Sequence, residues 1–195
     1  VARMACSPGD TVILNDPFLG GTHLPDVTLV APVFVADGLA GFVVNRAHHA
    51  DIGAASPGSM PISASLDDEG LVIPPTRLVE NDRVISDRLD RLASATRNTD
   101  EARGDFSAQV AANRAGVARL DSLIDSYGTA GFALGVDALN AYAERLARAA
   151  LKAIPGGEYR FVDLLDDDGQ GNVDIPIQLV LKVDDTGVEA DPCRS

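Results

Sequence analysis

The sequence predicts an α+β fold of one continuous domain, built in three consecutive parts. Short β-branched runs separated by proline and glycine turns fill residues 1–85, a pattern typical of strands and hairpins. Over residues 86–156 the apolar residues recur at helical spacing, which indicates a central antiparallel helical pair. Strand character returns over residues 157–195 and predicts a C-terminal β-hairpin. Hydrophobic residues make up 46% of the 195 residues, so the chain can bury a sizeable core.

Composition limits the partners and the compartment that we expect. A formal net charge of −13 argues against a nucleic-acid surface, which needs a basic stripe. No run approaches the ~18 apolar residues of a membrane span, and no signal peptide is visible. Cys6 and Cys193 do not make a disulfide framework, and reduced thiols are expected. We therefore expect a cytoplasmic protein without a nucleic-acid or membrane partner. The chain begins at Val1 and stops just after a strand-like stretch, so we also expect a fragment of a longer protein.

The N-terminal part begins with a short strand and a tight bend. Thr11-Val-Ile-Leu14 is a β-branched run that follows a turn, and Asn15-Asp-Pro-Phe18 ends it. Gly20-Gly21 lets the backbone bend sharply before His23. Since Leu24 precedes a proline, the segment from His23 to Asp26 is expected to be extended or turned.

A hairpin is predicted to bring two segments of the chain together. Val27 to Val35 and Leu39 to Asn45 are strand candidates, and Asp37-Gly38 between them is a strong turn pair. A two-residue turn at 37–38 places Asp26 opposite His49 and Val27 opposite His48. If the strand register slips by one or two residues, His48 and His49 still lie beside Asp26. The two histidine-bearing segments are therefore predicted to meet in space.

The remaining elements follow from local patterns. The small-residue loop from Gly53 to Pro61 either approaches a ligand closely or simply connects two elements. Short strands are expected at 71–73 and 78–79, the latter ending at an Asn81-Asp82 turn. Helices are predicted at about 87–95, from an N-cap at Thr99 to Gly128, and from 130 to 153. The C-terminal hairpin turns at Asp166-Asp-Asp-Gly169, because this acidic run lacks the twelve-residue pattern of a calcium loop.

Every histidine of the chain lies in the two segments that the hairpin joins. His23, His48 and His49 fall within 27 residues, and Asp16, Asp26 and Asp51 lie among them. Two imidazoles and one carboxylate can hold a metal ion and leave coordination positions open for water or substrate. We predict His23, Asp26 and His48 as metal ligands, with His49 as the alternate, because His48 and His49 point to opposite faces of a strand. An isolated His-x-x-Asp motif is more often structural, and that alternative stays open.

A polar stripe on the second predicted helix and the lack of nucleotide-binding motifs also bear on function. Asp105, Gln109 and Asn113 recur at four-residue intervals beside the apolar stripe of the second helix. They could line the site, but a solvated helix face is the favoured interpretation. The sequence contains no Gly-x-Gly-x-x-Gly or Walker A loop, so nucleotide binding within this chain is not supported.

Several long motifs resemble the hydantoinase B/oxoprolinase family. The longest is Gly9-Asp-Thr-Val-Ile-Leu-Asn-Asp-Pro-Phe-Leu-Gly-Gly-Thr-His-Leu-Pro-Asp26, followed by Arg46-Ala-His-His-Ala-Asp-Ile-Gly53. The likeness covers about residues 8–185. It continues through Ser56-Pro-Gly-Ser-Met-Pro61, Glu69-Gly70, Ile73-Pro-Pro75, Gly104-Asp105, Gln109 and Asn113. The family includes the B-type part of N-methylhydantoinase, the matching half of 5-oxoprolinase and the alpha subunit of acetone carboxylase. Its members are considerably longer than this chain, which agrees with a fragment.

The resemblance implies an ATP-dependent cyclic amidohydrolase acting on a hydantoin or 5-oxoproline. A hydantoinase A-type subunit or domain would use ATP to phosphorylate a substrate carbonyl, and the B part would complete the reaction in an oligomer. Acetone carboxylase-like members hold manganese with the His-x-x-Asp motif and a later histidine, which implies His23, Asp26 and His48 here, with zinc or iron as alternatives. His49 or Asp51 is assigned as general base.

Two other functions stay open. One is a fragment of a ketone carboxylase alpha subunit, which would use the same metal on an acetone-type substrate. The other is a non-catalytic assembly module, inactive as an isolated fragment.

Overall fold

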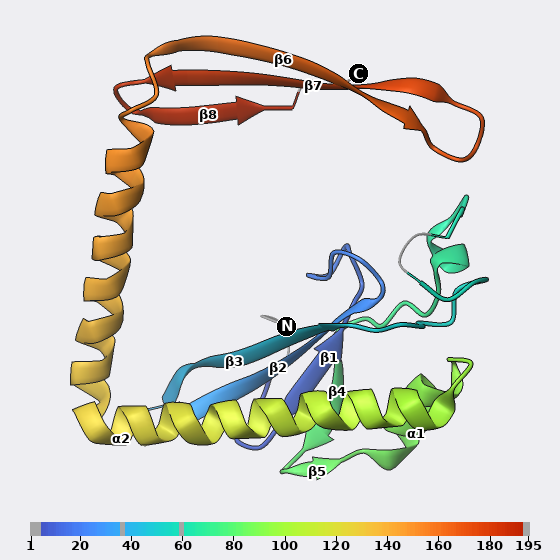
Figure 1. Ribbon diagram of the computed structural model, residues 1–195. Coiled ribbons are helices and arrows are strands. Elements are labelled where there is room, and N and C mark those ends of the chain that lie inside the picture. The colour runs from blue at the N-terminus through green and yellow to red at the C-terminus, as the bar shows by residue number, and fades with distance from the viewer. Residues whose placement is uncertain (1–4, 36–37, 59–60, 193–195) are drawn as a thin grey trace. The chain divides into compact units, whose positions relative to one another are not determined.

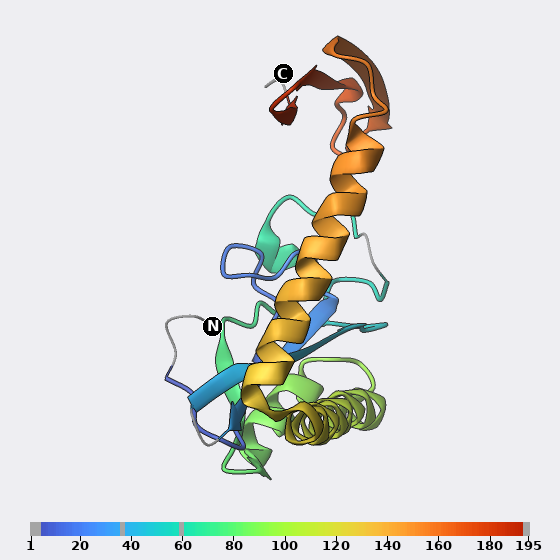
Figure 2. The same ribbon diagram turned by 90° about the vertical axis from the view of Figure 1, so that its left-hand side faces the viewer.

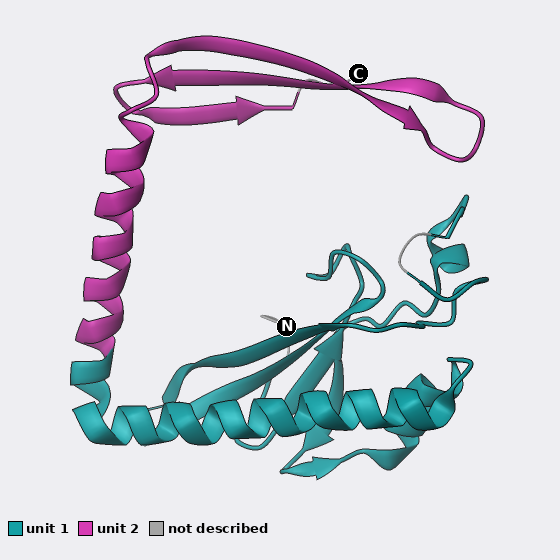
Figure 3. Cartoon of the chain, viewed as in Figure 1, with its two compact units in different colours: residues 1–132 teal, residues 133–195 magenta. Residues whose placement is uncertain are grey.

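The computed structural model describes residues 5–35, 38–58 and 61–192, and the chain divides into two compact units (Figure 3). Unit 1 spans residues 1–132 and unit 2 spans residues 133–195. The predicted α+β class is confirmed: an antiparallel sheet precedes a long helical region, and a second antiparallel sheet follows it. The division predicted after residues 85 and 156 stays a prediction. The predicted turn residue Asp37, the motif residues Ser59 and Met60, and Cys193 lie outside the described residues.

Unit 1 is built on a five-stranded sheet in which all neighbouring strands are antiparallel (Figure 1). The strand order is β3-β2-β1-β4-β5, so β3 is an edge strand. Asn81 and Asp82, both at positive φ, form the predicted turn between the last two strands. The strands are β1 (Thr11–Leu14), β2 (Asp26–Val35), β3 (Gly38–His48), β4 (Thr76–Glu80) and β5 (Arg83–Val84).

The register of the β2–β3 hairpin differs by one residue from that of a two-residue turn at 37–38. Asp26 pairs with His48, and the register shifts once more between Val33 and Phe34, where the ladder contains a bulge. Gly38 already pairs with Val35. This difference lies within the register slip of one or two residues that was expected. The two histidine-bearing segments therefore lie side by side as predicted.

Two helices follow the sheet, α1 (Ser86–Ser94) and α2 (Thr99–Leu151), after a short 3₁₀ helix η1 (Leu66–Glu69). Thr99 was predicted as the N-cap of α2, but that prediction is wrong by one residue. The Asn98 side chain accepts a hydrogen bond from the Glu101 backbone N–H (3.3 Å) and donates one to the Glu101 carboxylate (2.8 Å). Asn98 therefore closes the first turn, and Thr99 is already helical.

The first half of α2 packs along one face of the sheet. Figure 2 shows this half nearly end-on beside the strands. The hydrophobic side chains between them are aliphatic apart from Phe106, as expected from a sequence with 5% aromatic residues. The buried cluster consists of Ile13, Leu24, Val27, Leu29, Ile52, Ile73, Leu78, Val79, Leu89, Ala93, Ala102, Phe106 and Val110.

Gly128 interrupts α2 with a non-helical backbone (φ 70°, ψ 157°). The sequence predicted the end of a helix at this glycine, and positive φ is the conformation that favours glycine there. Residues 99–127 belong to unit 1, whereas residues 133–151 belong to unit 2. Antiparallel packing of the two halves therefore stays a prediction. None of the helices in the described ranges has a stretch both long and apolar enough to cross a membrane.

Unit 2 contains the second half of α2 and a three-stranded antiparallel sheet. Its strands are β6 (Gly157–Asp167), β7 (Val173–Asp184) and β8 (Gly187–Asp191), in the order β6-β7-β8. The predicted hairpin corresponds to β6 and β7. The third strand was not predicted, because Gly187-Val-Glu-Ala-Asp191 is short and has too few β-branched residues to indicate a strand.

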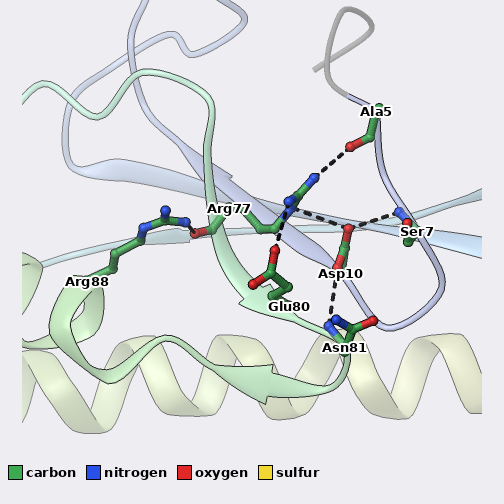
Figure 4. A network of polar contacts seen from close by, with 7 residues as sticks. All are labelled: Ala5, Ser7, Asp10, Arg77, Glu80, Asn81 and Arg88. Carbon is green, nitrogen blue, oxygen red and sulfur yellow. Dashed lines mark hydrogen bonds and ion pairs between the residues drawn. The ribbon is translucent and has the colours of Figure 1, made fainter.

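A polar network secures the start of β1 against β4 and α1 (Figure 4). The Asp10 carboxylate is 3% exposed, accepts a hydrogen bond from the Ser7 backbone N–H (2.9 Å) and lies 3.3 Å from Nε of Arg77. Arg77 also contacts Glu80 (3.0 Å) and donates to the Ala5 carbonyl (2.7 Å), while Arg88 donates to the Arg77 carbonyl. The segment before β1 is therefore joined to β4, and β4 is joined in turn to α1.

Candidate metal centre

Asn15, directly after β1, shapes the loop that carries His23. Its side chain is fully buried, and its amide donates to the carbonyls of Leu24 (2.8 Å) and Leu71 (2.9 Å). Its carbonyl oxygen accepts a hydrogen bond from the Ile73 backbone N–H (2.6 Å). One side chain thus joins the end of β1 to the 16–25 loop and to the segment before β4. The sequence predicted only that Asn15 ends a strand.

Gly21 makes the bend of this loop possible. Its backbone N–H donates to the Asp16 carbonyl (2.7 Å), and a Cβ at this position would lie 1.9 Å from the Asn15 carbonyl oxygen. No side chain fits in that space, so the sharp turn predicted from Gly20-Gly21 requires glycine at the second position. The turn delivers His23 next to the start of β2.

The β2–β3 register and the loop bring three predicted ligands together. Nδ1 of His48 lies 2.7 Å from Oδ1 of Asp26, and the rings of His23 and His48 are 5.6 Å apart at 44°. One candidate ligand atom from each of the three residues lies within 4.8 Å of the others. His48 is 46% exposed and Asp26 is 28% exposed, so solvent or a substrate can reach the group.

Two imidazoles and a carboxylate fit a divalent metal ion. Ligand atoms held about 2.0–2.2 Å from one ion lie no more than about 4.4 Å apart. The three candidate ligand atoms lie within 4.8 Å of one another, close to this limit. Three protein ligands would leave coordination positions open.

His49, the alternate ligand, lies on the opposite face of the sheet. It is 3% exposed and stacks on Phe106 of α2, with ring centroids 4.6 Å apart. Its Nε2 is 2.9 Å from Oε1 of Gln109. The structure therefore does not bring His49 to the group formed by His23, Asp26 and His48. The general-base role of His49 stays a prediction.

Gln109 of α2 contacts β2 and β3, the two strands that carry proposed ligands, on the face of the sheet that α2 covers. Its amide nitrogen donates to the Val27 carbonyl (2.9 Å) and to Oδ1 of Asn45 (2.9 Å). Because both donors are used there, Oε1 is the acceptor that faces His49, and Nε2 of His49 carries the hydrogen. Asn45 in turn donates to the Gln109 carbonyl and to Oδ1 of Asn113, both at 2.8 Å.

This network corrects one interpretation of the sequence. Gln109 is 6% exposed and Asn113 is 1% exposed, so the favoured solvated helix face is wrong for both residues. Asp105, the third member of the stripe, is exposed. The four-residue spacing was the available signal, but it could not show that Asn45 and His49 supply partners across the interface.

Replacing Gln109 with leucine is expected to lower the free energy of unfolding by about 2–3 kcal/mol. The change leaves the Val27 carbonyl, the Asn45 side chain and His49 without their buried partner, and each orphaned group carries a desolvation cost. Urea unfolding followed by circular dichroism measures the difference.

The matched control is Asn113→Ala, one turn further along α2. Within the described residues, the Asn113 amide nitrogen has no hydrogen-bond partner, and Asn45 keeps its bond to the Gln109 carbonyl when Asn113 is truncated. This variant is expected to lose about 1 kcal/mol. Equal losses from the two variants would show that Gln109 does not hold the strands.

Asp51, the other predicted general base, is engaged in a structural contact. Its two oxygens accept hydrogen bonds from the Arg97 backbone N–H (2.7 Å), from Nη1 of Arg97 (2.9 Å) and from the Gly53 N–H (2.8 Å). Arg97 also donates to the carbonyls of Ala54 and Ala55. Burial raises the pKa of Asp51, but the hydrogen bonds from Arg97 and Gly53 outweigh it, so the pKa is lowered. Its general-base role also stays a prediction.

The lowered pKa of Asp51 predicts a loss of stability in acid. The stabilising contribution is present above the ordinary aspartate pKa, about 3.9, and disappears as the pH falls through the lower folded value. The stability advantage of the natural chain over Asp51→Asn is therefore expected to shrink below about pH 4. Urea unfolding of both proteins between pH 6 and pH 2.5 measures it, with Asp137→Asn, an exposed carboxylate on α2, as control. An advantage that is constant over this range would contradict the prediction.

Comparison with known proteins assigns a family to this arrangement. Residues 1–194 match the profile of the hydantoinase B/oxoprolinase family. A protein of Pseudomonas sp. (strain NS671), named as the B-type part of a D-/L-hydantoinase, is 36% identical over 191 residues, which cover 94% of this chain and 32% of that protein.

Two solved structures of larger enzymes share the fold. An ATP-dependent caprolactamase from Pseudomonas jessenii superposes with a TM-score of 0.85 and 29% identity, over 94% of this chain and 32% of that one. A nucleotide-free acetone carboxylase superposes with a TM-score of 0.71 and 20% identity, over 97% of this chain and 27% of that one. At 20% identity the second likeness concerns the fold alone. The chain thus spans about a third of the length of these proteins.

Proposed function

Because this chain belongs to the hydantoinase B/oxoprolinase family, we propose that it is part of a subunit that hydrolyses a cyclic amide, a hydantoin or 5-oxoproline, together with an ATP-using A-type partner. The observation that carries the proposal is the close fold likeness to an ATP-dependent caprolactamase, an enzyme named for a cyclic amide. A relative named as one part of a multi-subunit hydantoinase supports the need for a partner. The sequence has no phosphate-binding loop, so ATP use is assigned to the partner.

His23, Asp26 and His48 hold a divalent metal in this proposal, with manganese as the first choice and zinc or iron as the alternatives. When bound, such an ion polarises a carbonyl or phosphoryl oxygen and lowers the pKa of a bound water. Asp26 supplies the one negative charge among the three ligands, and the two imidazoles supply neutral donors. Their position on the exposed face of the sheet leaves the open side of the group toward solvent, where a substrate can approach.

The proposed reaction is tested by combining the 195-residue chain with an A-type partner, Mn²⁺ and ATP. Ring opening of 5-oxoproline or hydantoin, with release of ADP, is expected only when both proteins are present. His23→Ala is expected to abolish it, whereas Asn140→Ala, an exposed change on α2, is expected to leave it unchanged. Ring opening without ATP or without the partner would contradict the proposal.

Two further outcomes of the same experiment would assign the other functions. ATP-dependent consumption of acetone and bicarbonate, without ring opening, would place the chain with the ketone carboxylases. A stable complex with the partner that turns over none of these substrates would support a non-catalytic assembly module.

A further inference from the structure

Arg46 lies on the same face of β3 as His48, two residues earlier. Its Nε donates to Oγ1 of Thr28 and its Nη1 donates to Oγ1 of Thr22, each at 2.9 Å. Thr28 is paired with Arg46 on β2, and Thr22 directly precedes His23. The guanidinium is therefore held in place by the same two segments that supply His23 and Asp26.

Both anchors of Arg46 are neutral hydroxyl groups. Within the described part of the chain, no carboxylate lies within ion-pair distance of Arg46, whereas Arg77 and Arg97 each contact an aspartate. The Asp26 carboxylate, on the neighbouring strand, contacts His48 instead. The Arg46 guanidinium is thus fixed by two hydroxyl groups, while its charge has no carboxylate partner among the described residues. Its planar fork matches the oxygens of a carboxylate or a phosphate.

The spacing allows one ligand to reach both Arg46 and the metal-binding group. Two residues along a strand span about 7 Å, which is the size of a small organic anion. A cavity of about 370 Å³ also touches Arg46 and His48, but His49 and Gln109 line it as well, so it opens on the face of β3 that packs against α2 and is not the space in front of the guanidinium. On the face that carries the proposed ligands, Arg46 and His48 are both exposed, so a ligand can approach them from solvent.

From this geometry we propose that Arg46 binds the oxyanion of a substrate whose reacting group lies at His23, Asp26 and His48. The proposal deepens the proposed function, on which it rests, by assigning an anionic substrate class to the site. Thr22 and Thr28 act by holding the guanidinium, so that its remaining N–H groups face the ligand. A phosphate and a carboxylate can both accept hydrogen bonds from a guanidinium. The experiment distinguishes them by comparing a phosphate probe with a carboxylate probe.

The test measures binding of inorganic phosphate and of acetate to the metal-free chain by NMR titration of the Thr22, Thr28 and Arg46 amides. Saturable binding of at least one probe is expected, and the probe that binds more tightly identifies the oxyanion. Arg46→Gln is expected to weaken it about 10–100-fold, the usual range for charge-assisted hydrogen bonds. Arg46→Lys keeps the positive charge but loses the planar fork of N–H donors. Its affinity for the probe is expected to lie between those of the natural chain and Arg46→Gln.

The control is Arg83→Gln, which removes the same charge from β5 at the opposite edge of the sheet. It is expected to leave probe binding unchanged. Equal affinity of the natural chain and Arg46→Gln, or no saturable binding to the natural chain, would overturn the proposal. Urea unfolding of Arg46→Gln separates a role in tethering the loop, which affects stability, from a role in binding the anion.

Metal binding is measured separately, so the two proposals can fail independently. A chain that binds Mn²⁺ but neither probe would overturn only the role of Arg46. A chain that binds a probe through Arg46 but takes up no metal would overturn the metal site and leave the oxyanion site standing.

Discussion

Asp26→Asn is expected to lower the affinity of the chain for Mn²⁺ by at least about 100-fold. Loss of groups that only support metal ligands costs about 10–100-fold, and loss of a direct ligand charge should reach or exceed the top of that range. Asparagine has nearly the same size and can still pair with His48, so the hairpin is expected to keep its register. Titration of Mn²⁺ followed by electron paramagnetic resonance measures the affinity.

A matched control removes one negative charge nearby without touching the proposed ligands. Asp105 is an exposed carboxylate of α2 that lines the cavity beside His48. Asp105→Asn is expected to change Mn²⁺ affinity less than about threefold, as for a screened surface charge. Equal losses in the two variants would mean that Mn²⁺ responds only to the general negative charge of this region.

Asn15→Ala is expected to lower the free energy of unfolding by about 3–5 kcal/mol. The change orphans the carbonyls of Leu24 and Leu71 and the N–H of Ile73, in a fully buried place, and each unpaired group costs about 1–3 kcal/mol. Loss of the Leu24 contact also releases the loop that carries His23. Weaker Mn²⁺ binding is therefore expected in the same variant.

Urea unfolding measures this loss, with Asn140→Ala on the exposed surface of α2 as the control. The control is expected to change the free energy of unfolding by less than about 0.5 kcal/mol. A loss below about 1 kcal/mol for Asn15→Ala would show that water replaces the three contacts. Asn15→Asp adds a second comparison, since it keeps an acceptor for Ile73 but no amide donor for the two carbonyls.

Local patterns were sufficient to predict how the site is assembled. Alternating β-branched residues on both sides of a turn define a hairpin, and a hairpin has few possible registers. For that reason the proximity of Asp26 to the segment with His48 and His49 could be predicted from residue numbers alone. The bend at Gly21 could also be predicted, because two consecutive glycines allow backbone conformations that other residues rarely adopt.

The features that were missed depend on contacts between distant segments. A polar residue at helical spacing indicates a solvent-exposed helix face unless the surface that packs against the helix is known. The sequence therefore predicts the wrong environment for Gln109 and Asn113. Asn15 was assigned only to the end of a strand, because its partners Leu71 and Ile73 come more than fifty residues later. The strand β8 has too little local preference of its own and forms as the neighbour of β7.

Metal content of the purified 195-residue chain, after equilibration with Mn²⁺ and removal of excess ion, tests most directly whether His23, Asp26 and His48 form one site. The expected result is one Mn²⁺ per chain, lost in His23→Ala and retained in Asp105→Asn, with both variants folded by circular dichroism. Absence of bound metal in the natural chain, or full retention in folded His23→Ala, would contradict the proposed metal centre.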